Sequence, residues 1–327
     1  MTEFSLLLPV YAGDKPAAFE RALLSSTVEQ SQRPAQVVVV QDGPVSAELQ
    51  RVLKRYLDGI PVPGAVGAGG EGAKPGEAAA AKPGEAGSTA AHGAKIPVKL
   101  VLLPENRGLT AALNAGLREC AHDIVARIDA DDVSLPERFA KQLPLVAEGY
   151  DLVGSAMFEF SDTARPLSLT ELRAVPEGAR LRLPPIGGER IRDHARTHNP
   201  FNHPTMVYRR SRVLAVGGYQ DIGKMEDYWL GIRVISSGAR VANVAEPLVG
   251  YNTAGAYGRR GGWREAITEA RLQYRMLRIG FVTLPQYLRN VVMKCGYRLL
   301  PAGIKRVLFE RFISGGLPGD KSSAAKK

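Results

Sequence analysis

The 327-residue sequence predicts an α/β fold in which a mostly parallel central sheet is flanked by helices and followed by C-terminal amphipathic helices. The first observation is that strand-like and helix-like segments alternate up to residue 160, which is typical of βαβ units. The second is a run of four valines at 37–40, which is typical of a central strand covered on both faces. The third is an ordinary globular composition, with 45% hydrophobic and 23% charged residues, in a chain long enough to bury a substantial core.

The alternating segments follow one another in a regular order. Parallel sheets bind ligands at the carboxyl ends of their strands, so the residues after each predicted strand are the first candidates for a site. The predicted elements are a strand at 4–10, a helix at 17–29, a strand at 37–40, a helix at 48–57, a strand at 99–103, a helix at 110–121 and a strand at 124–128.

A stretch rich in Gly, Ala and Pro, residues 62–95, interrupts this alternation. It contains the sequence AKPGEA twice, at 73–78 and at 81–86. Such a segment cannot bury enough apolar surface to offset the loss of chain entropy on folding. We therefore expect a disordered insertion that has no catalytic role and that tolerates shortening.

The net charge of +10 is confined to the C-terminal part of the chain. Residues 251–327 contain 15 Lys and Arg against 4 Asp and Glu, a net of +11. Residues 1–250 contain 28 basic and 29 acidic residues, a net of −1. Because the body of the protein is close to neutral, we expect no nucleic-acid partner and assign the basic end a partner of its own.

Residues 285–327 form a basic amphipathic region and tail. Arg289, Lys294 and Arg298 lie beside an apolar helical face, a pattern typical of a helix that lies in an anionic membrane surface. The alternative is a pair of helices that pack on the preceding domain. The apolar positions are Tyr287, Leu288, Val291, Val292, Cys295 and Leu299, followed by Ile304, Val307, Leu308 and Phe312.

Three features of the sequence bear on its location. The apolar segment 4–11 lacks the basic residues and the cleavage site of a signal peptide. No run of about 18 apolar residues predicts a transmembrane helix. Cys120 and Cys295 form no disulfide framework or metal-ligand spacing, which favours a reducing compartment. We expect a cytoplasmic protein that is peripheral on the inner face of the cell membrane.

Acidic residues stand directly after the strand predicted at 124–128, in the sequence Asp129-Ala130-Asp131-Asp132. Carboxylates at a strand end supply the hard oxygen ligands that Mg²⁺ and Mn²⁺ prefer, and the remaining positions of such an ion suit diphosphate oxygens and water. Three clustered acids would repel one another without a cation. The pattern on its own is also that of an ordinary acidic turn, and its neighbours decide between the two interpretations.

Three more predicted strand ends carry polar or close-approach groups. Pro9, Val10 and Tyr11 end the first strand, and Asp42 ends the valine strand in the sequence QDG. Asn106 and Arg107 follow the third strand in ENRGL. Any one of these groups is explained by a turn or a helix cap, but together they predict a nucleotide site at one edge of the sheet.

The ordered motifs LLLPVY, VVVVQDGP, ENRGLTAALNAGL, RIDADDVSLPERFAKQ and KMEDYWLGIRVISSGA resemble the family 2 glycosyltransferases of the Rossmann-like GT-A fold. NPFNHPTMVYRRSRVLAVGGY, followed by MEDYWL and YGRRGG, resembles the amylovoran-biosynthesis-type branch of that family. The likeness spans residues 1–60 and 96–280.

The resemblance implies roles for the residues at the strand ends. Pro9, Tyr11 and Asp42 would contact the nucleotide base, and Asn106 and Arg107 would lie near base and ribose. Asp129 and Ala130 would also line the nucleotide site, where Asp129 would contact the ribose or the metal ion. Asp131 would hold a Mn²⁺ or Mg²⁺ ion that bridges the diphosphate, with Asp132 behind it.

Glu226 and Asp227 begin a predicted helix, EDYWLGIRVISSG. An acid pair at a helix N-terminus is explained on its own by a favourable interaction with the helix dipole. The resemblance implies that Asp227 is the general base, taking a proton from the acceptor hydroxyl as that oxygen attacks the anomeric carbon. Glu226 would position the acceptor or the base. One direct displacement would invert the anomeric centre while the metal neutralises the leaving diphosphate.

Two further segments are candidates for the acceptor or diphosphate pocket. Asn202 and His203 precede a strand-like TMVY, where a loop histidine is more often a structural residue. Arg259 and Arg260 lie in the glycine-rich sequence GAYGRRGG, which could close over the diphosphate. The alternative for the arginine pair is a basic surface loop.

The sequence therefore predicts a catalytic domain at 1–250, a mobile basic loop and helix that complete the site at 251–284, and the basic region at 285–327. The expected donor is a UDP- or dTDP-linked sugar, and the expected acceptor is a glycan or a polyprenyl-linked glycan in cell-surface polysaccharide synthesis. The absence of a QxxRW signature and of a transmembrane bundle favours addition of a single sugar. The alternatives are a nucleotidyltransferase and a non-catalytic basic module that binds nucleic acid or anionic lipid.

Overall fold

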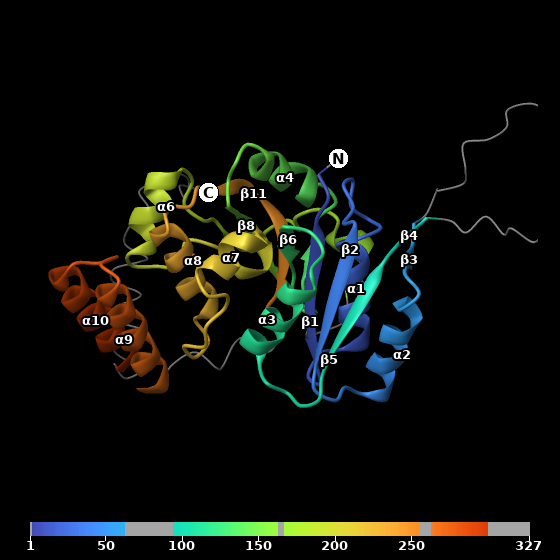
Figure 1. Cartoon of the computed structure of the whole chain (residues 1–327), viewed down its shortest axis with the longest axis horizontal. Coiled ribbons are helices and arrows are strands. Elements are labelled where there is room, and N and C mark those ends of the chain that lie inside the picture. The colour runs from blue at the N-terminus through green and yellow to red at the C-terminus, as the bar shows by residue number, and fades with distance from the viewer. Residues whose placement is uncertain (1, 63–93, 163–166, 255–262, 300–327) are drawn as a thin grey trace, which may run out of the picture.

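The computed structural model describes residues 2–62, 94–162, 167–254 and 263–299. Its centre is a mixed sheet in which the strands run in the order β5-β2-β1-β6-β10-β8-β11-β7, with β9 beside β8 (Figure 1). Helices cover both faces of this sheet, and a helical hairpin stands at one end of the molecule. The predicted α/β class and mostly parallel sheet are confirmed.

The first half of the chain forms the parallel part of the sheet, as predicted. The strands are β1 (Ser5–Tyr11), β2 (Gln36–Asp42), β5 (Val98–Leu103) and β6 (Ile124–Arg127), and all three contacts among them are parallel. The helices between them are α1 (Pro16–Ser25), α2 (Ala47–Tyr56) and α3 (Leu109–Glu119). Helix α1 ends before residue 29, because the hydroxyl of Thr27 and the amide of Gln30 donate to carbonyls of the last turn.

The second half adds strands of both directions. Strand β10 (Val207–Arg209) lies antiparallel between β6 and β8 (Leu152–Phe160), and β11 (Val241–Asn252) runs parallel to β8. Short strands β7 (Val133–Ser134) and β9 (Leu181–Arg182) pair antiparallel with β11 and β8. The helices of this half are α4 (Arg138–Ala147), α5 (Leu169–Leu172), α6 (Gly188–Ala195), α7 (Arg210–Ala215) and α8 (Glu226–Ser236), with a 3-10 turn, η1, at His203–Thr205.

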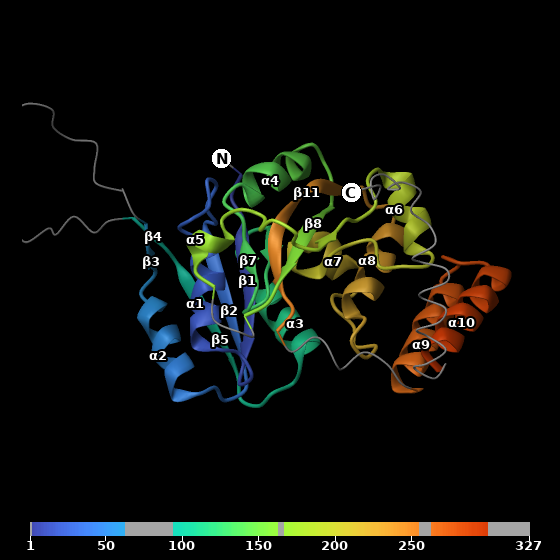
Figure 2. The ribbon, with the colours of Figure 1, turned by 180° about the vertical axis from the view of Figure 1, so that it is seen from behind.

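Alternate residues of the central strands enter two different hydrophobic cores. Leu7 and Val38 face the core that contains α3, α6, α8 and the C-terminal hairpin. Leu6 and Val37 face the core that contains α1, α2 and α4 (Figure 2). Because both faces of β1 and β2 are buried, their sequences are almost entirely apolar rather than alternating.

The two ends of the repeat-containing stretch predicted at 62–95 form a short antiparallel pair of strands. These strands are β3 (Ile60–Pro61) and β4 (Lys95–Ile96), which pair with each other. Residues 63–93 lie outside the described residues, so the disorder expected for them stays a prediction. These two ends lie beside α2, at the end of the molecule opposite the C-terminal hairpin.

The C-terminal hairpin consists of α9 (Trp263–Arg278) and α10 (Leu284–Leu299). Helix α9 packs on the body, with Leu272 and Met276 in the core beside α8. Helix α10 packs on α9, which corresponds to the alternative considered for this segment. Among the described residues, no helix has the length and apolar character that a membrane crossing requires.

Candidate active site

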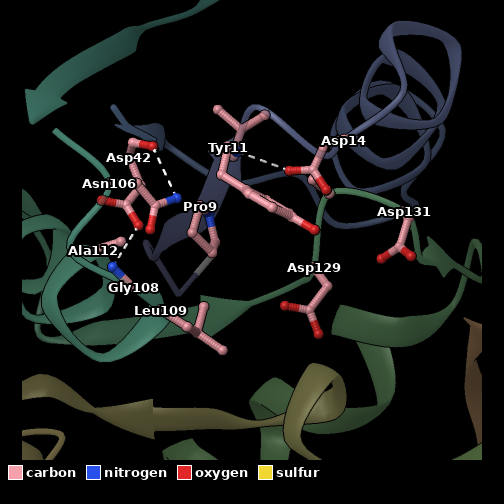
Figure 3. A pocket seen from close by; sticks show the side chains of 12 residues that line it. Pro9, Tyr11, Asp14, Asp42, Asn106, Gly108, Leu109, Ala112, Asp129 and Asp131 are labelled. Atoms are coloured by element: carbon pink, nitrogen blue, oxygen red, sulfur yellow. Dashed lines mark hydrogen bonds between the residues drawn. The ribbon is translucent and has the colours of Figure 1, made fainter. Parts of the chain in front are cut away.

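The carboxyl ends of β1, β2, β5 and β6 surround a cavity of about 360 Å³ (Figure 3). The structure thus brings together the strand ends that the sequence singled out. The walls of this cavity are formed by Pro9, Val10, Tyr11, Asp14, Asp42, Asn106, Gly108, Leu109, Ala112, Asp129, Ala130 and Asp131. Only Asp14, Gly108, Leu109 and Ala112 were not among the predicted site residues.

Asp42 fixes the loop that begins α3. Its two carboxylate oxygens accept the backbone N–H groups of Arg107 and Gly108, at 2.7 and 2.8 Å. Asn106 donates its side-chain amide to the Asp42 carbonyl at 3.4 Å. Gly108 has φ +84°, a conformation that glycine adopts without strain. Asp42 therefore holds β2 against the β5–α3 loop, and each of its oxygens keeps a lone pair for a ligand in the cavity.

Arg107 enters the site differently from the prediction. Its backbone N–H binds Asp42, whereas its side chain is exposed and is not part of the cavity wall among the described residues. In this structure the position contributes to the site through its main chain.

Asp14 faces Asp129 and Asp131 across the cavity (Figure 3). Its carboxylate accepts the backbone N–H of Tyr11 at 2.9 Å, which holds the turn after β1. Burial and the charges of Asp131 and Asp129 raise the pKa of Asp14 to about 7. The same causes, burial and the neighbouring Asp129, raise the pKa of Asp131 to about 6. The cavity therefore holds more negative charge than its described surroundings neutralise.

Arg127 is the buried cation beneath these acids. Its guanidinium is completely buried and binds both carboxylate oxygens of Asp129, one of them at 2.9 Å. Arg138, also completely buried, donates to the Arg127 carbonyl at 2.6 Å, and burial with the charge of Arg127 lowers its pKa to about 9. Arg127 thereby fixes the direction of Asp129 from inside the sheet.

Asp132 points away from the cavity into the protein. One of its oxygens accepts the backbone N–H of Asn252 at 2.8 Å, and the other is buried without a hydrogen-bond partner among the described residues. Burial and its acidic neighbours raise its pKa well above the usual range. Asp132 therefore ties the acidic turn to the end of β11.

The acids fit a divalent ion that is completed by a substrate. Asp131 lines the cavity beside Asp129, and Asp129 is already oriented by Arg127. Within the described ranges, no three His, Cys, Asp or Glu side chains converge as a complete metal site. A Mg²⁺ or Mn²⁺ ion commonly takes only one or two carboxylates from the protein and fills its other positions with phosphate oxygens and water.

A second cavity, of about 400 Å³, adjoins the first and shares Asp129 with it. It lies between β8, η1 and the N-terminus of α8. Its walls are Asp129, Met157, Arg182, Asn199, Phe201, Asn202, His203, Pro204, Lys224, Glu226, Asp227 and Tyr251. The predicted residues Asn202, His203, Glu226 and Asp227 are therefore in one pocket next to the first cavity.

Asp227 is held in place by two hydrogen bonds. Asn199 donates its side-chain amide to one oxygen at 2.7 Å, and the backbone N–H of Tyr228 donates to the other at 2.7 Å. Burial nevertheless raises the pKa of Asp227. Burial and the charge of Asp227 raise the pKa of Glu226 to about 7. A buried, oriented carboxylate with a raised pKa is what a general base near neutral pH requires.

Asn202 and His203 are anchored as well as exposed to the second cavity. The Asn202 amide donates to the carbonyls of Ser155 and Arg182, at 2.9 and 3.2 Å, and so joins β8 to β9. A ring nitrogen of His203 lies 3.3 Å from the hydroxyl of Tyr219, and burial with the charge of Arg127 lowers the pKa of His203 well below its usual range. A neutral imidazole can line a pocket without adding charge.

Arg259 and Arg260 lie outside the described residues. Strand β11 ends at Asn252 and α9 begins at Trp263, so the predicted loop connects the second cavity's wall to the hairpin.

The chain matches the model of Glycosyl transferase family 2 over residues 87–217. It is 30% identical over 314 residues to the amylovoran biosynthesis glycosyltransferase AmsE of Erwinia amylovora, covering 94% of this chain and 98% of that protein. It is also 26% identical to a UDP-Gal:alpha-D-GlcNAc-diphosphoundecaprenol beta-1,3-galactosyltransferase of Escherichia coli, over 95% of this chain and 96% of that one.

Solved structures share the fold at low sequence identity. TarS of S. aureus, residues 1–349, superposes with a TM-score of 0.56 and 13% identity, covering 95% of this chain and 75% of that one. A mannosyltransferase of Pyrobaculum calidifontis, solved with GDP-Man and Mn²⁺, superposes with a TM-score of 0.52 and 16% identity, covering 90% of this chain and 69% of that one.

Proposed function

Because this chain belongs to glycosyl transferase family 2, we propose that it transfers a single sugar from a nucleoside-diphosphate sugar to a hydroxyl of a lipid-linked or other glycan acceptor in cell-surface polysaccharide synthesis. The observation that carries the proposal is the pair of adjoining cavities that share Asp129. The first suits a nucleotide, and the second holds an oriented acid pair where an acceptor would meet the sugar. A nucleotidyltransferase or a non-catalytic basic module gains no support from the relatives that cover the whole chain.

The donor would occupy the first cavity. Pro9 and Tyr11 offer a flat apolar surface to a base, and Asp42 offers a carboxylate lone pair to its N–H groups. Uridine and deoxythymidine carry such a donor. The structure of TarS, which shares the fold, has been solved with UDP and with UDP-GlcNAc, and this supports a uridine-linked donor.

A divalent ion would be held by Asp131 together with Asp129 and the donor diphosphate. When bound, Mn²⁺ or Mg²⁺ supplies positive charge that stabilises the leaving nucleoside diphosphate. The proximity of Asp14 and Asp131 to Asp129 supports this assignment, because burying carboxylates close to one another is costly without a cation that the three can share.

Asp227 would act as the general base. It accepts the proton of the acceptor hydroxyl while that oxygen attacks the anomeric carbon from the side opposite the diphosphate, so that the anomeric centre inverts in one step. Asn199 holds one Asp227 oxygen, and the second lone pair of each oxygen remains available to the hydroxyl. Glu226, the residue before Asp227 at the start of α8, would position the acceptor through hydrogen bonds to the acceptor's other hydroxyl groups.

The acceptor proposal rests on the relatives and on the charge distribution. The Escherichia coli relative acts on an acceptor linked to diphosphoundecaprenol, and this chain covers 96% of it. Such an acceptor is anchored in a membrane, which agrees with the net charge of +11 over residues 251–327. We place the protein at the inner, cytoplasmic face of the cell membrane as a peripheral enzyme.

A transfer assay tests this function. The protein is incubated with Mn²⁺, a panel of UDP-, dTDP- and GDP-sugars and a lipid-diphosphate-linked sugar acceptor, and the anomeric configuration of the product is read by NMR. We expect one donor to be used with inversion, and Asp227→Asn to lower kcat by about 10² to 10⁴ at an unchanged donor affinity. Retention of configuration, or full activity of Asp227→Asn, would refute the mechanism.

A further inference from the structure

Exposed apolar side chains gather at one end of the molecule. In the part of the chain that the structure describes, fifteen large apolar side chains are exposed, and eleven of them lie on the α9–α10 hairpin or on the segment 181–186. Figures 1 and 2 show the hairpin and α6, which follows that segment, at the same end. The eleven are Leu181, Leu183, Ile186, Trp263, Ile267, Tyr274, Ile279, Leu284, Leu288, Val292 and Met293.

Helix α10 turns polar side chains as well as apolar ones toward the protein. Asn290, only 2% exposed, donates its amide to Gln273 of α9 at 3.0 Å and to the carbonyl of Arg196 at 2.8 Å. Lys294 forms an ion pair with the buried Glu269 at 2.8 Å. The seam of the hairpin therefore contains a hydrogen-bonded polar network, which leaves part of the apolar side of α10 at the surface.

The outward side of α10 is apolar. Leu284, Leu288 and Val292 are spaced four residues apart, so they form one stripe along the helix, and they are 57%, 53% and 71% exposed. The half-buried Tyr287, Val291 and Cys295 do not share this exposure, so the predicted apolar face is divided between contact with α9 and the surface. A continuous apolar stripe of this kind on a free surface indicates a binding face.

The outward side of α9 adds positive charge to this end. Arg264, Arg271 and Arg278 are exposed and lie seven residues apart, beside the exposed Trp263 and Tyr274. The two acids of the hairpin do not oppose them, since Glu269 is paired with Lys294 and Glu265 is half-buried. Exposed apolar side chains, interfacial aromatic rings and exposed arginines on one hairpin complement an anionic lipid surface.

The segment 181–186 links this end to the second cavity. Arg182 lines the second cavity, and the next residues, from Leu183 to Ile186, line an open groove beside His194 of α6. The end of α6 in turn contacts α10, through the bond from Asn290 to Arg196. The second cavity, the groove and the hairpin are therefore linked in series through the segment 181–186 and α6.

We propose that the end of the molecule formed by the α9–α10 hairpin and the segment 181–186 is the surface that rests on an anionic bilayer, with the stripe of α10 inserted among the lipids. The second cavity then lies beside the membrane surface from which a lipid-linked acceptor extends. That second part rests on the proposed function, whereas binding of the hairpin to lipid does not.

Vesicle binding by the full-length protein tests the surface. The variant Leu288→Glu/Val292→Glu changes two exposed side chains and leaves the buried seam intact. The matched control, Leu57→Glu/Leu214→Glu, adds the same charges at apolar residues that are 40% and 42% exposed on other elements. We expect wild type and control to bind vesicles of phosphatidylcholine with phosphatidylglycerol equally. The α10 variant should have a partition coefficient at least about tenfold lower, because each apolar side chain placed in lipid contributes about 1.5 kcal/mol or more.

Tryptophan fluorescence gives an independent readout. The chain has two tryptophans, of which Trp229 is buried in the body and Trp263 is 63% exposed on the hairpin. Anionic vesicles should shift the emission of the wild type to shorter wavelength, and Trp263→Phe should abolish the shift. Equal vesicle binding by the α10 variant and the wild type would overturn the surface assignment. So would a change of oligomeric state in that variant without loss of vesicle binding, which would identify the stripe as a contact between copies.

Activity separates this proposal from the proposed function. The α10 variant should glycosylate a water-soluble, short-chain diphosphate acceptor at the wild-type rate and lose transfer to a polyprenyl acceptor embedded in vesicles. If the wild type binds vesicles through α10 but transfers sugar to neither acceptor, the surface stands and the glycosyltransferase function with this acceptor fails. If both acceptors are used equally well by the α10 variant, the orientation on the membrane is wrong.

Discussion

Replacement of Arg127 by methionine should destabilise the protein through Asp129. The guanidinium is completely buried and binds both oxygens of a carboxylate whose side chain is 28% exposed. Removing one partner of a fully buried pair costs about 3 to 5 kcal/mol, because the other charge is left unpaired. Since Asp129 keeps some contact with solvent, we expect Arg127→Met to lower the free energy of unfolding by about 2 to 4 kcal/mol.

A double-mutant cycle isolates the pair from the packing of the arginine. Asp129→Asn alone leaves the buried guanidinium without its anion, and the double variant Arg127→Met/Asp129→Asn removes both charges. We expect a coupling energy of about 1 to 3 kcal/mol, measured by urea unfolding with the fluorescence of the buried Trp229 as the signal. Arg118→Met, on the exposed side of α3, is the control for a loss of charge alone.

The cycle also has outcomes that would contradict this account. A coupling energy below about 0.5 kcal/mol would mean that the contact does not hold Asp129 in solution. A decrease in stability no larger than that of Arg118→Met would mean that the buried guanidinium is not needed by the acids around it.

Three further predictions concern the other acids of the site. The pKa of Glu226 is raised to about 7 and that of Asp227 is raised as well, so kcat/KM should fall as the pH drops below about 7. Glu226→Gln should move that decrease to lower pH, and a profile that stays flat from acidic to neutral pH would contradict the proposed base. Without ligands, the folded state keeps a proton on Asp14 up to about pH 7, whereas the unfolded chain loses it near pH 3.8, so Tm should fall as the pH rises through this window. Asp14→Asn should weaken this dependence of Tm on pH, and an unchanged dependence in calorimetry would refute the raised pKa. Asp42→Asn places the NH₂ of an amide opposite one of two backbone N–H donors, so it should lower the free energy of unfolding, measured in urea, by about 1.5 to 3 kcal/mol. The surface variant Asp58→Asn should change that free energy little, and equal effects of the two variants would show that the hydrogen bonds of Asp42 contribute nothing.

Strand ends were predictable because apolar runs and the residues that follow them are local features. The run of valines places Asp42 at the end of β2, and the apolar run before Asp129 places Asp131 at the same edge, so the first cavity follows from the sequence and the topology of parallel strands. The second half of the sheet was not predictable in the same way. Strand β10 is three residues long and antiparallel, and its place between β6 and β8 depends on tertiary packing.

The residues that orient the acids were missed for a related reason. Arg127 lies inside the predicted strand 124–128, where a charged residue gives no local sign of its partner, and Asn199 is 28 residues from the Asp227 that it holds. Arg107 was expected near base and ribose, but the hydrogen bond from its backbone N–H to Asp42 has no signal in the sequence.

The C-terminal helix shows what periodicity can and cannot determine. The sequence shows an apolar helical face at 287–299, and the structure contains a helix there. Which side of that helix meets the protein depends on α9, whose facing residues Glu269 and Gln273 are polar and buried. The side of α10 that is exposed therefore could not be determined from the apolar residues alone.

Isothermal titration of nucleoside diphosphates tests the central claim most directly. UDP, dTDP and GDP are titrated with and without Mn²⁺ into the wild type and into Asp131→Ala. We predict that one diphosphate, UDP or dTDP, binds in a manner that depends on Mn²⁺, and that Asp131→Ala loses the effect of the metal. If no diphosphate binds, or if Asp131→Ala binds with the same affinity and the same dependence on Mn²⁺, the cavity at the strand ends is not the donor site.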